Sequence, residues 1–193
     1  MKPEDEQANR RCQILAEKHG LNELIEEAID FAETTLNRPV TDKDVLRLWE
    51  HRDKISKTID KVVVCKKGCD YCCHMAVGIS TFEAEIIRSV TGRQLAEVPQ
   101  VPNPPEENVK KYVGVPCPFL VGGACSIYEA RPTACRTYFN LADDPELCNL
   151  KYMNDVPSID LRWYWVVEAN AIFKLGMTVA DIREWFPEET DDE

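Results

Sequence analysis

The sequence of 193 residues lacks several features that would assign it to a common class of protein. It has no apolar run long enough to span a bilayer, and its charged N-terminal residues lack the apolar core of a signal peptide. It is also short of positive charge, with 23 Lys and Arg against 34 Asp and Glu, which disfavours binding to phosphate backbones. We therefore expect a soluble, cytoplasmic protein that binds neither nucleic acid nor a membrane.

Familiar catalytic motifs are missing as well. The chain contains no Gly-rich phosphate loop, no H-E-x-x-H and no G-x-S-x-G sequence. It also lacks the alternating strands and helices from which barrel enzymes and thioredoxin-like folds are built. The sequence therefore leaves open whether the protein is an enzyme.

Cysteine, in contrast, is abundant, with nine residues. Reducing compartments keep thiols unpaired, so cysteines in a cytoplasmic protein favour metal or redox roles over structural disulfides. Cys12 stands apart in a helical segment, and we interpret it as a small buried residue outside any site. The other eight fall between positions 65 and 148 and are the candidate metal ligands: Cys65, Cys69, Cys72, Cys73, Cys117, Cys125, Cys135 and Cys148.

The first four candidates lie within nine residues, in the spacing C-x3-C-x2-C-C. Short loops of this kind bring sulfurs toward one point, as soft metals such as zinc and iron require. A zinc ion or a [4Fe-4S] cluster takes four ligands, so eight candidates are too many for one such site. Because adjacent side chains on an extended backbone point in opposite directions, Cys72 and Cys73 either serve two metals or lie on a tight turn that bridges a multinuclear centre.

Three further candidates follow a proline-rich connection at residues 98–105. A Gly-Gly turn between two short apolar runs predicts a hairpin that brings Cys117 and Cys125 close together. Pro132 suits the first position of a helix, which places Cys135 in the first turn, where the backbone dipole favours thiolate. Ligands on both sides of the connection indicate a single site folded across it.

Basic residues near the cysteines are candidates for compensating the charge of clustered thiolates. Lys66 and Lys67 lie in the first loop, and Arg131 and Arg136 flank the start of the predicted helix. The alternative is that these four are exposed, solubilising charges. His74 follows the paired cysteines as a candidate ligand or proton carrier, although a lone histidine is more often a packing or surface residue.

Apolar residues that repeat every three or four positions predict a mainly α fold, a compact helical domain around a loop- and hairpin-supported cysteine metal site. We expect a single domain of residues 1–193. Its predicted parts are the N-terminal helices 1–64, the cysteine-cluster segment 65–148 and the C-terminal helices 149–193.

Local signals place individual elements within this plan. Gly20 predicts a break in the first helical stretch, and Ser80 with Glu83 three residues later forms a capping box that begins another helix. In the C-terminal part, the apolar stretch 161–175 predicts the central core helix. A last helix is expected from Val179 to Phe186.

The cysteine pattern also resembles a known family, the YkgJ-type cysteine-cluster proteins, whose CxxCxxCC domain is described as zinc- or iron-chelating. The resemblance is carried by Cys65-x3-Cys69-x2-Cys72-Cys73, Cys117-Pro118-Phe119-Leu120 and Cys125-Ser126-Ile127-Tyr128-Glu129-Ala130-Arg131-Pro132-Thr133-Ala134-Cys135-Arg136. It implies metal chelation by Cys65, Cys69, Cys72, Cys73, Cys117, Cys125 and Cys135. Cys148 fits a later cysteine that part of the family has.

Two principal functions are consistent with these features. The first is a metal-binding protein that chelates zinc or iron, with a [4Fe-4S] cluster as one form of the iron. The alternative is an iron–sulfur enzyme that modifies a protein side chain, because the C-x3-C-x2-C spacing resembles that of radical S-adenosylmethionine enzymes. A third hypothesis is a thiol redox protein in which Cys72 and Cys73 exchange disulfides. The expected partner is a metal ion, a protein is a further candidate partner, and the sequence leaves the oligomeric state open.

Overall fold

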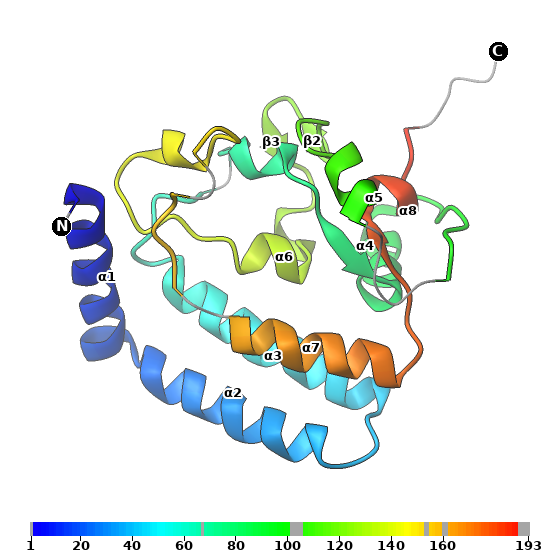
Figure 1. Cartoon of the computed structure of the whole chain (residues 1–193), viewed down its shortest axis with the longest axis horizontal. Helices are drawn as coiled ribbons and strands as arrows, with labels where there is room; N and C mark the ends of the chain where they lie inside the picture. The colour runs from blue at the N-terminus through cyan, green and yellow to red at the C-terminus, as the bar shows by residue number, and fades with distance from the viewer. Residues whose placement is uncertain (1, 67, 101–105, 153–154, 160–161, 189–193) are drawn as a thin grey trace. The chain divides into compact units, whose positions relative to one another are not determined.

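The structure is a computed structural model that describes residues 2–66, 68–100, 106–152, 155–159 and 162–188 (Figure 1). The described chain is mainly α, as predicted. It divides into two compact units: unit 1 comprises residues 1–66 and 136–176, and unit 2 comprises residues 67–135 and 177–193. Each unit is thus built from two separate segments of chain, and the single domain expected for residues 1–193 stays a prediction.

Unit 1 is helical throughout its described elements. These are α1 (Pro3–His19), α2 (Leu21–Leu36), α3 (Asp42–Ile59), the short 3₁₀ helix η3 (Pro145–Cys148) and α7 (Arg162–Lys174). Gly20 separates α1 from α2 with a left-handed φ of 63°, which confirms the predicted break. Helices α2, α3 and α7 pack against one another (Figure 1) and bury apolar side chains such as Ala28, Leu48 and Ala171.

The predicted core helix at residues 161–175 corresponds to α7. Val167 and Ala171 are buried, whereas Phe173 is 68% exposed, so one face of the helix contributes to the core. Residue 161 and the side chains of residues 162–166 lie outside the described part of the chain.

Unit 2 combines short helices with two small antiparallel sheets. Its elements are η1 (Tyr71–His74), β1 (Gly78–Ser80), α4 (Thr81–Thr91), α5 (Glu106–Lys111), β2 (Leu120–Val121), β3 (Ala124–Cys125), η2 (Tyr128–Ala130), β4 (Val179–Asp181) and α8 (Ile182–Trp185). Helix α6 (Thr133–Arg136) begins in this unit, and its last residue belongs to unit 1. The apolar core gathers side chains from both segments of unit 2, including Ile79, Ile87, Phe119 and Phe186.

Strand β4 corrects one expectation from the sequence. Val179 to Phe186 was expected to be helical, but residues 179–181 form a strand that pairs with β1 in the register Gly78↔Asp181 and Ser80↔Val179. Only Ile182–Trp185 are helical. Pairing with a strand about a hundred residues away gives hydrogen-bond partners to the backbone of β4. This pairing outweighs the weak helical preference of residues 179–181.

The predicted hairpin is confirmed, with β2 and β3 paired across the Gly-Gly turn. The capping box at Ser80 and Glu83 is confirmed at the start of α4. Of the proline-rich connection, residues 101–105 lie outside the described part. None of the helices in the described ranges is long and apolar enough to cross a bilayer.

Candidate metal centre

Six of the eight candidate ligands lie in unit 2: Cys69, Cys72, Cys73, Cys117, Cys125 and Cys135. The remaining two, Cys65 and Cys148, belong to unit 1. Cys65 follows α3 by a few residues, and Cys148 is buried at the end of η3. Neither these eight cysteines nor Cys12 in α1 forms a disulfide in the described chain.

The first cysteine segment of unit 2 is wound into the single turn η1. The backbone N–H of Cys73 donates to the carbonyl of Asp70 at 2.9 Å, and that of Met75 donates to Cys72 at 3.2 Å. Cys72 and Cys73 therefore lie on a tight turn, one of the two arrangements expected for adjacent ligands. On such a turn their side chains need not point in opposite directions.

A backbone hydrogen bond joins this turn to the second cysteine segment, across the proline-rich connection. The N–H of Cys117 donates to the carbonyl of Cys73 at 2.7 Å, and the N–H of Gly114 donates to that of His74 at 2.8 Å. The chain then enters the hairpin, in which Leu120 pairs with Cys125. These bonds bring Cys73 and Cys117 together and place Cys125 on the neighbouring strand.

The third cysteine segment is α6, and its start is fixed by a buried carboxylate. Glu83, only 4% exposed, accepts hydrogen bonds at 2.7 Å from both the backbone N–H and the hydroxyl of Thr133. The same carboxylate group accepts from the N–H of Ser80 at 3.0 Å. One residue thus caps α4 and α6 together and sets the position of Cys135 in its first turn, as predicted.

The electrostatics of the thiols show how closely five of them are grouped. A hydrogen bond with Cys72 raises the pKa of Cys73, and burial and the nearby Cys117 and Cys125 raise it further. Burial likewise raises the pKa of Cys135 well above its usual range, with added repulsion from Cys72, Cys117 and Cys125, so burial outweighs the preference for thiolate expected at the helix start. Cys72, Cys73, Cys117, Cys125 and Cys135 therefore lie within electrostatic range of one another.

Cys117 also has contacts that stabilise its thiolate form. Burial raises its pKa to about 11, although a hydrogen bond from the backbone of Phe119 and the charge of Arg183 lower it. A backbone N–H that donates to cysteine sulfur favours the thiolate, which is the form that binds a metal. Cys117 therefore has local support as a ligand.

The described residues contain no group of three or more His, Cys, Asp or Glu side chains already arranged to hold a metal ion. The donor set itself, several half-buried thiols of one unit, fits zinc or iron and would suit hard cations such as magnesium poorly.

The basic residues proposed to compensate thiolate charge have different surroundings. Arg131 donates to the carbonyl of Tyr128 at 2.9 Å, and its charge lowers the pKa of Cys135, as expected of a compensating residue. Arg136 is 4% exposed and pairs with Asp53 of unit 1 at 2.9 Å. That ion pair gives Arg136 a partner of its own, so its predicted compensating role is less direct.

Two other expectations concern the first loop. The His74 ring lies with Nδ1 3.3 Å from the carbonyl of Asp70, and its role as a ligand or proton carrier stays a prediction. Lys66 is an exposed residue of unit 1, and Lys67 lies outside the described residues.

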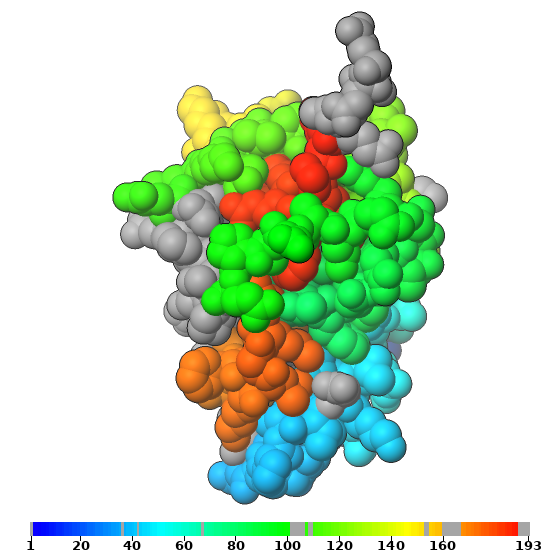
Figure 2. All heavy atoms as spheres, turned by 90° about the vertical axis from the view of Figure 1, so that its right-hand side faces the viewer, coloured from blue at the N-terminus to red at the C-terminus, as the bar shows by residue number. Residues whose placement is uncertain are grey.

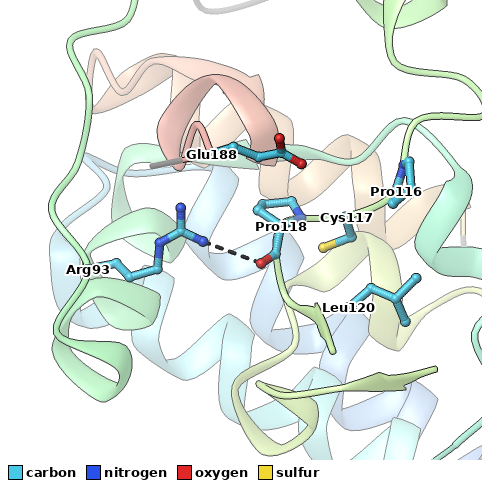
Figure 3. Close-up of a pocket in the computed structure, with 6 residues that line it drawn as sticks. All are labelled: Arg93, Pro116, Cys117, Pro118, Leu120 and Glu188. Atoms are coloured by element: carbon cyan, nitrogen blue, oxygen red, sulfur yellow. Dashed lines mark hydrogen bonds between the residues drawn. The ribbon is translucent and has the colours of Figure 1, made fainter. Parts of the chain in front are cut away.

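An open hollow of about 400 Å³ lies beside Cys117 (Figure 3). It is lined by Arg93, Pro116, Cys117, Pro118, Leu120 and Glu188. Arg93 donates to the carbonyl of Pro118 at 3.3 Å and so anchors one wall of this hollow (Figure 3). The Cys117 side chain consequently faces a space that solvent can enter.

Sequence reasoning missed two residues that contact the cysteine segments, Asp181 and Arg183. Both lie in the C-terminal segment of unit 2, more than a hundred residues after the first cysteine loop. Asp181 begins α8 by accepting from the backbone N–H of Arg183 at 2.9 Å, and an Asp at a helix start was a usable local signal. Nothing local indicates that Arg183 donates to carbonyls of the cysteine segments.

Comparison with known proteins gives one finding. Residues 64–155 match the model of the CxxCxxCC family, described as "Putative zinc- or iron-chelating domain", which confirms the resemblance to the cysteine-cluster family. Neither the curated proteins nor the solved structures provide a match to this chain.

Proposed function

Because residues 64–155 match the model of the CxxCxxCC family, we propose that this protein chelates zinc or iron through the thiols of unit 2. The proposed ligands are Cys69, Cys72, Cys73, Cys117, Cys125 and Cys135. The mutual electrostatic influence of five of these thiols carries the proposal, because residues from three separate segments come together in one unit.

The number of thiols bears on the kind of centre. Unit 2 alone holds more than the four ligands that a tetrahedral zinc ion or a [4Fe-4S] cluster takes. The tight turn at Cys72 and Cys73 favours a centre in which neighbouring sulfurs share metal ions. Cys65 and Cys148 are assigned a secondary role, since the ligand number is already sufficient without them.

The thiol donors would hold the metal as thiolates, so binding must release protons. The raised pKa values of Cys73, Cys117 and Cys135 favour the protonated form of these three thiols in the metal-free protein. The N–H group of Phe119 and the charges of Arg131 and Arg183 offset part of the negative charge that forms. Thiolates bind both zinc and iron, so which metal is bound depends on the availability of each metal as well as on its affinity.

The test is metal analysis of protein purified without oxygen, combined with its absorption spectrum. We expect bound zinc or iron in at least equimolar amount. A broad visible absorption would identify the iron as an iron–sulfur cluster, whereas a colourless protein would identify zinc. Protein that folds but retains neither metal after purification and supplementation would contradict the proposal.

Serine variants then locate the ligands. Cys117→Ser and Cys135→Ser should lower the metal content, because each removes a thiolate from the group. Cys12→Ser is the matched control, since Cys12 lies in α1 of unit 1 and is not among the eight candidates. Cys148→Ser should behave like the control if unit 2 holds the centre.

A further inference from the structure

The C-terminal segment of unit 2, residues 177–188, lies outside the family match yet contacts both cysteine-bearing segments. From these contacts, we infer that Arg183 is a positioning residue of the thiol centre, holding the Cys73 and Cys117 segments together before a metal binds. This inference rests on the metal-binding function proposed above.

The guanidinium of Arg183 is a shared donor for the two segments. Its Nη2 group donates to the carbonyls of Cys73 at 3.4 Å and Met75 at 3.0 Å on the first segment, and to that of Val115 on the second. Its Nε group donates to the carbonyl of Pro116 at 3.1 Å. A single planar group therefore contacts four carbonyls on both sides of the proline-rich connection.

Asp181 completes this arrangement. One carboxylate oxygen accepts from Arg183 Nη1 at 2.8 Å, and the other accepts from the backbone N–H of Val77 at 2.7 Å. Val77 lies four residues after Cys73 and directly precedes β1. Asp181 thus orients the arginine and also fixes the exit of the first cysteine segment.

Both members of the Asp181–Arg183 ion pair are buried. Asp181 is 5% exposed and Arg183 is 8% exposed, so neither side chain exchanges freely with water. Buried charges require partners, and the described contacts give the guanidinium both a carboxylate and carbonyl acceptors. Figure 2 shows the C-terminal segment, in red, packed among the green residues of the same unit.

The contacts lie directly beside the ligands. The carbonyl of Cys73 accepts from Arg183 and also from the backbone N–H of Cys117, so this one atom links the arginine to two candidate ligands. Pro116 and Val115 immediately precede Cys117. Moving the arginine would therefore shift the backbone at both ligands rather than at a remote site.

Lysine cannot replace this function, because an ammonium has no fixed fork that reaches several carbonyls in one plane. Arg183→Lys keeps the positive charge and removes the planar contacts. Arg183→Met removes both. Comparison of these two variants separates a positioning role from simple compensation of thiolate charge.

Trp185→Phe provides the matched control for general damage to α8. Trp185 lies two residues further along the helix and donates from its ring N–H to the carbonyl of Ile79 at 3.2 Å. The substitution removes one buried hydrogen bond of the same segment and none that the structure records to the cysteine segments. Phenylalanine keeps an aromatic ring in the core against which Cys117, Cys125 and Cys135 pack, so the variant should lower stability and leave the thiol centre intact.

The first measurement uses metal-free protein and follows amide hydrogen exchange of Cys117. Both Arg183 variants should speed its exchange, whereas Trp185→Phe should leave it close to the wild-type rate. Unchanged protection in Arg183→Met, or equal loss in the control, would overturn the inference whether or not the protein binds a metal.

The second measurement titrates cobalt(II) as a spectroscopic substitute and follows the thiolate-to-metal absorption bands. Arg183→Lys and Arg183→Met should both bind about 10- to 100-fold more weakly with altered bands, as expected for a residue that orients ligands. Recovery of the wild-type affinity and spectrum in Arg183→Lys would assign the residue to charge compensation and reject positioning. Absence of cobalt binding by the wild-type protein would instead contradict the proposed function, and the exchange measurement would still test the arginine.

Discussion

Single carboxylates determine where helices begin in both units. Glu83 in unit 2 accepts hydrogen bonds from Ser80 and Thr133, and Asp44 in unit 1 accepts from Thr41 at the start of α3. Each carboxylate accepts hydrogen bonds from backbone N–H groups that have no carbonyl partner at the start of a helix. At the residue scale, the start of α3 and the start of α4 each depend on one buried carboxylate.

Glu83→Gln should destabilise unit 2 by about 1–3 kcal/mol, because the amide places an N–H₂ donor where the carboxylate accepts only. The free energy of unfolding in urea, measured on metal-free protein, tests this. Glu85→Gln is the control, since Glu85 lies on the same helix in an exposed ion pair with Arg88. Equal unfolding midpoints for the two variants would contradict the dual capping role.

Asp44 leads to a prediction about acid. Hydrogen bonds from Arg38 and Thr41 lower the pKa of Asp44, so the folded protein favours the charged carboxylate. A lowered pKa stabilises the fold above the ordinary value of about 4 and ceases to do so as the pH falls toward the lowered value.

The stability lost in Asp44→Asn should consequently be largest at neutral pH and should shrink as the pH falls below about 4. Thermal unfolding at a series of pH values measures the difference between wild type and variant. Glu50→Gln, an exposed carboxylate of the same helix, should show no comparable trend. A difference that grew on acidification would reverse the sign and reject the explanation.

At the scale of elements, the β2–β3 hairpin presents Cys125 beside the strand that follows Cys117. Its turn residues Gly122 and Gly123 have φ values of 57° and 74°, as a two-residue turn between twisted strands requires. An added Cβ at either position would meet no atom within 4 Å, so any cost comes from backbone conformation and not from crowding.

Two substitutions at Gly122 separate these effects. Gly122→Asn should be tolerated, because asparagine adopts left-handed φ and Asn-Gly is a favoured turn. Gly122→Val should lower stability by about 1–2 kcal/mol and also weaken metal binding through Cys125. Urea unfolding together with metal titration measures both effects, and equal behaviour of the two variants would show that the turn conformation is unimportant.

The elements that the sequence predicted correctly are those whose signals are local. The break at Gly20, the capping box at Ser80 and Glu83, and the Gly-Gly hairpin all depend on residues within a few positions of one another. Strand β4 was missed because its partner β1 is about a hundred residues away. A strand of three residues is too short to show a clear alternation of apolar and polar residues, so the helical pattern of the residues that follow dominated the prediction.

The candidate site likewise has a part that the sequence predicts and a part that it does not. Spacing and resemblance selected the thiols, and the family match agrees with that selection at the level of the domain. Of the two contacting residues of the C-terminal segment, Asp181 had a local helix-start signal, whereas Arg183 could not be predicted, because a buried arginine that binds carbonyls has no sequence pattern. Such contacts arise only when the fold brings distant loops together.

At the scale of the whole molecule, two units of different construction share one chain. Unit 1 is stabilised by packed helices, with buried apolar residues such as Leu15 and Ile59. Unit 2 has short strands and short helices that supply fewer local hydrogen bonds each. Small units with little regular structure commonly depend on metals or other cross-links for stability.

Metal removal should therefore affect the two units unequally. A bound ion that favours only the folded state stabilises it in proportion to the logarithm of metal concentration over the dissociation constant. Chelation should raise amide exchange around Cys73, the hairpin and α6, and should leave α2 and α3 nearly unchanged, because local opening follows local stability.

Hydrogen exchange of the purified protein before and after chelation, followed by restoration of the metal, measures this pattern. Cys12→Ser should reproduce the wild-type response, and Cys135→Ser should resemble chelated protein even when metal is supplied. A uniform increase across both units would mean that the metal stabilises the chain as a whole. Unchanged exchange throughout unit 2 would mean that the thiols contribute nothing to its stability through a bound metal.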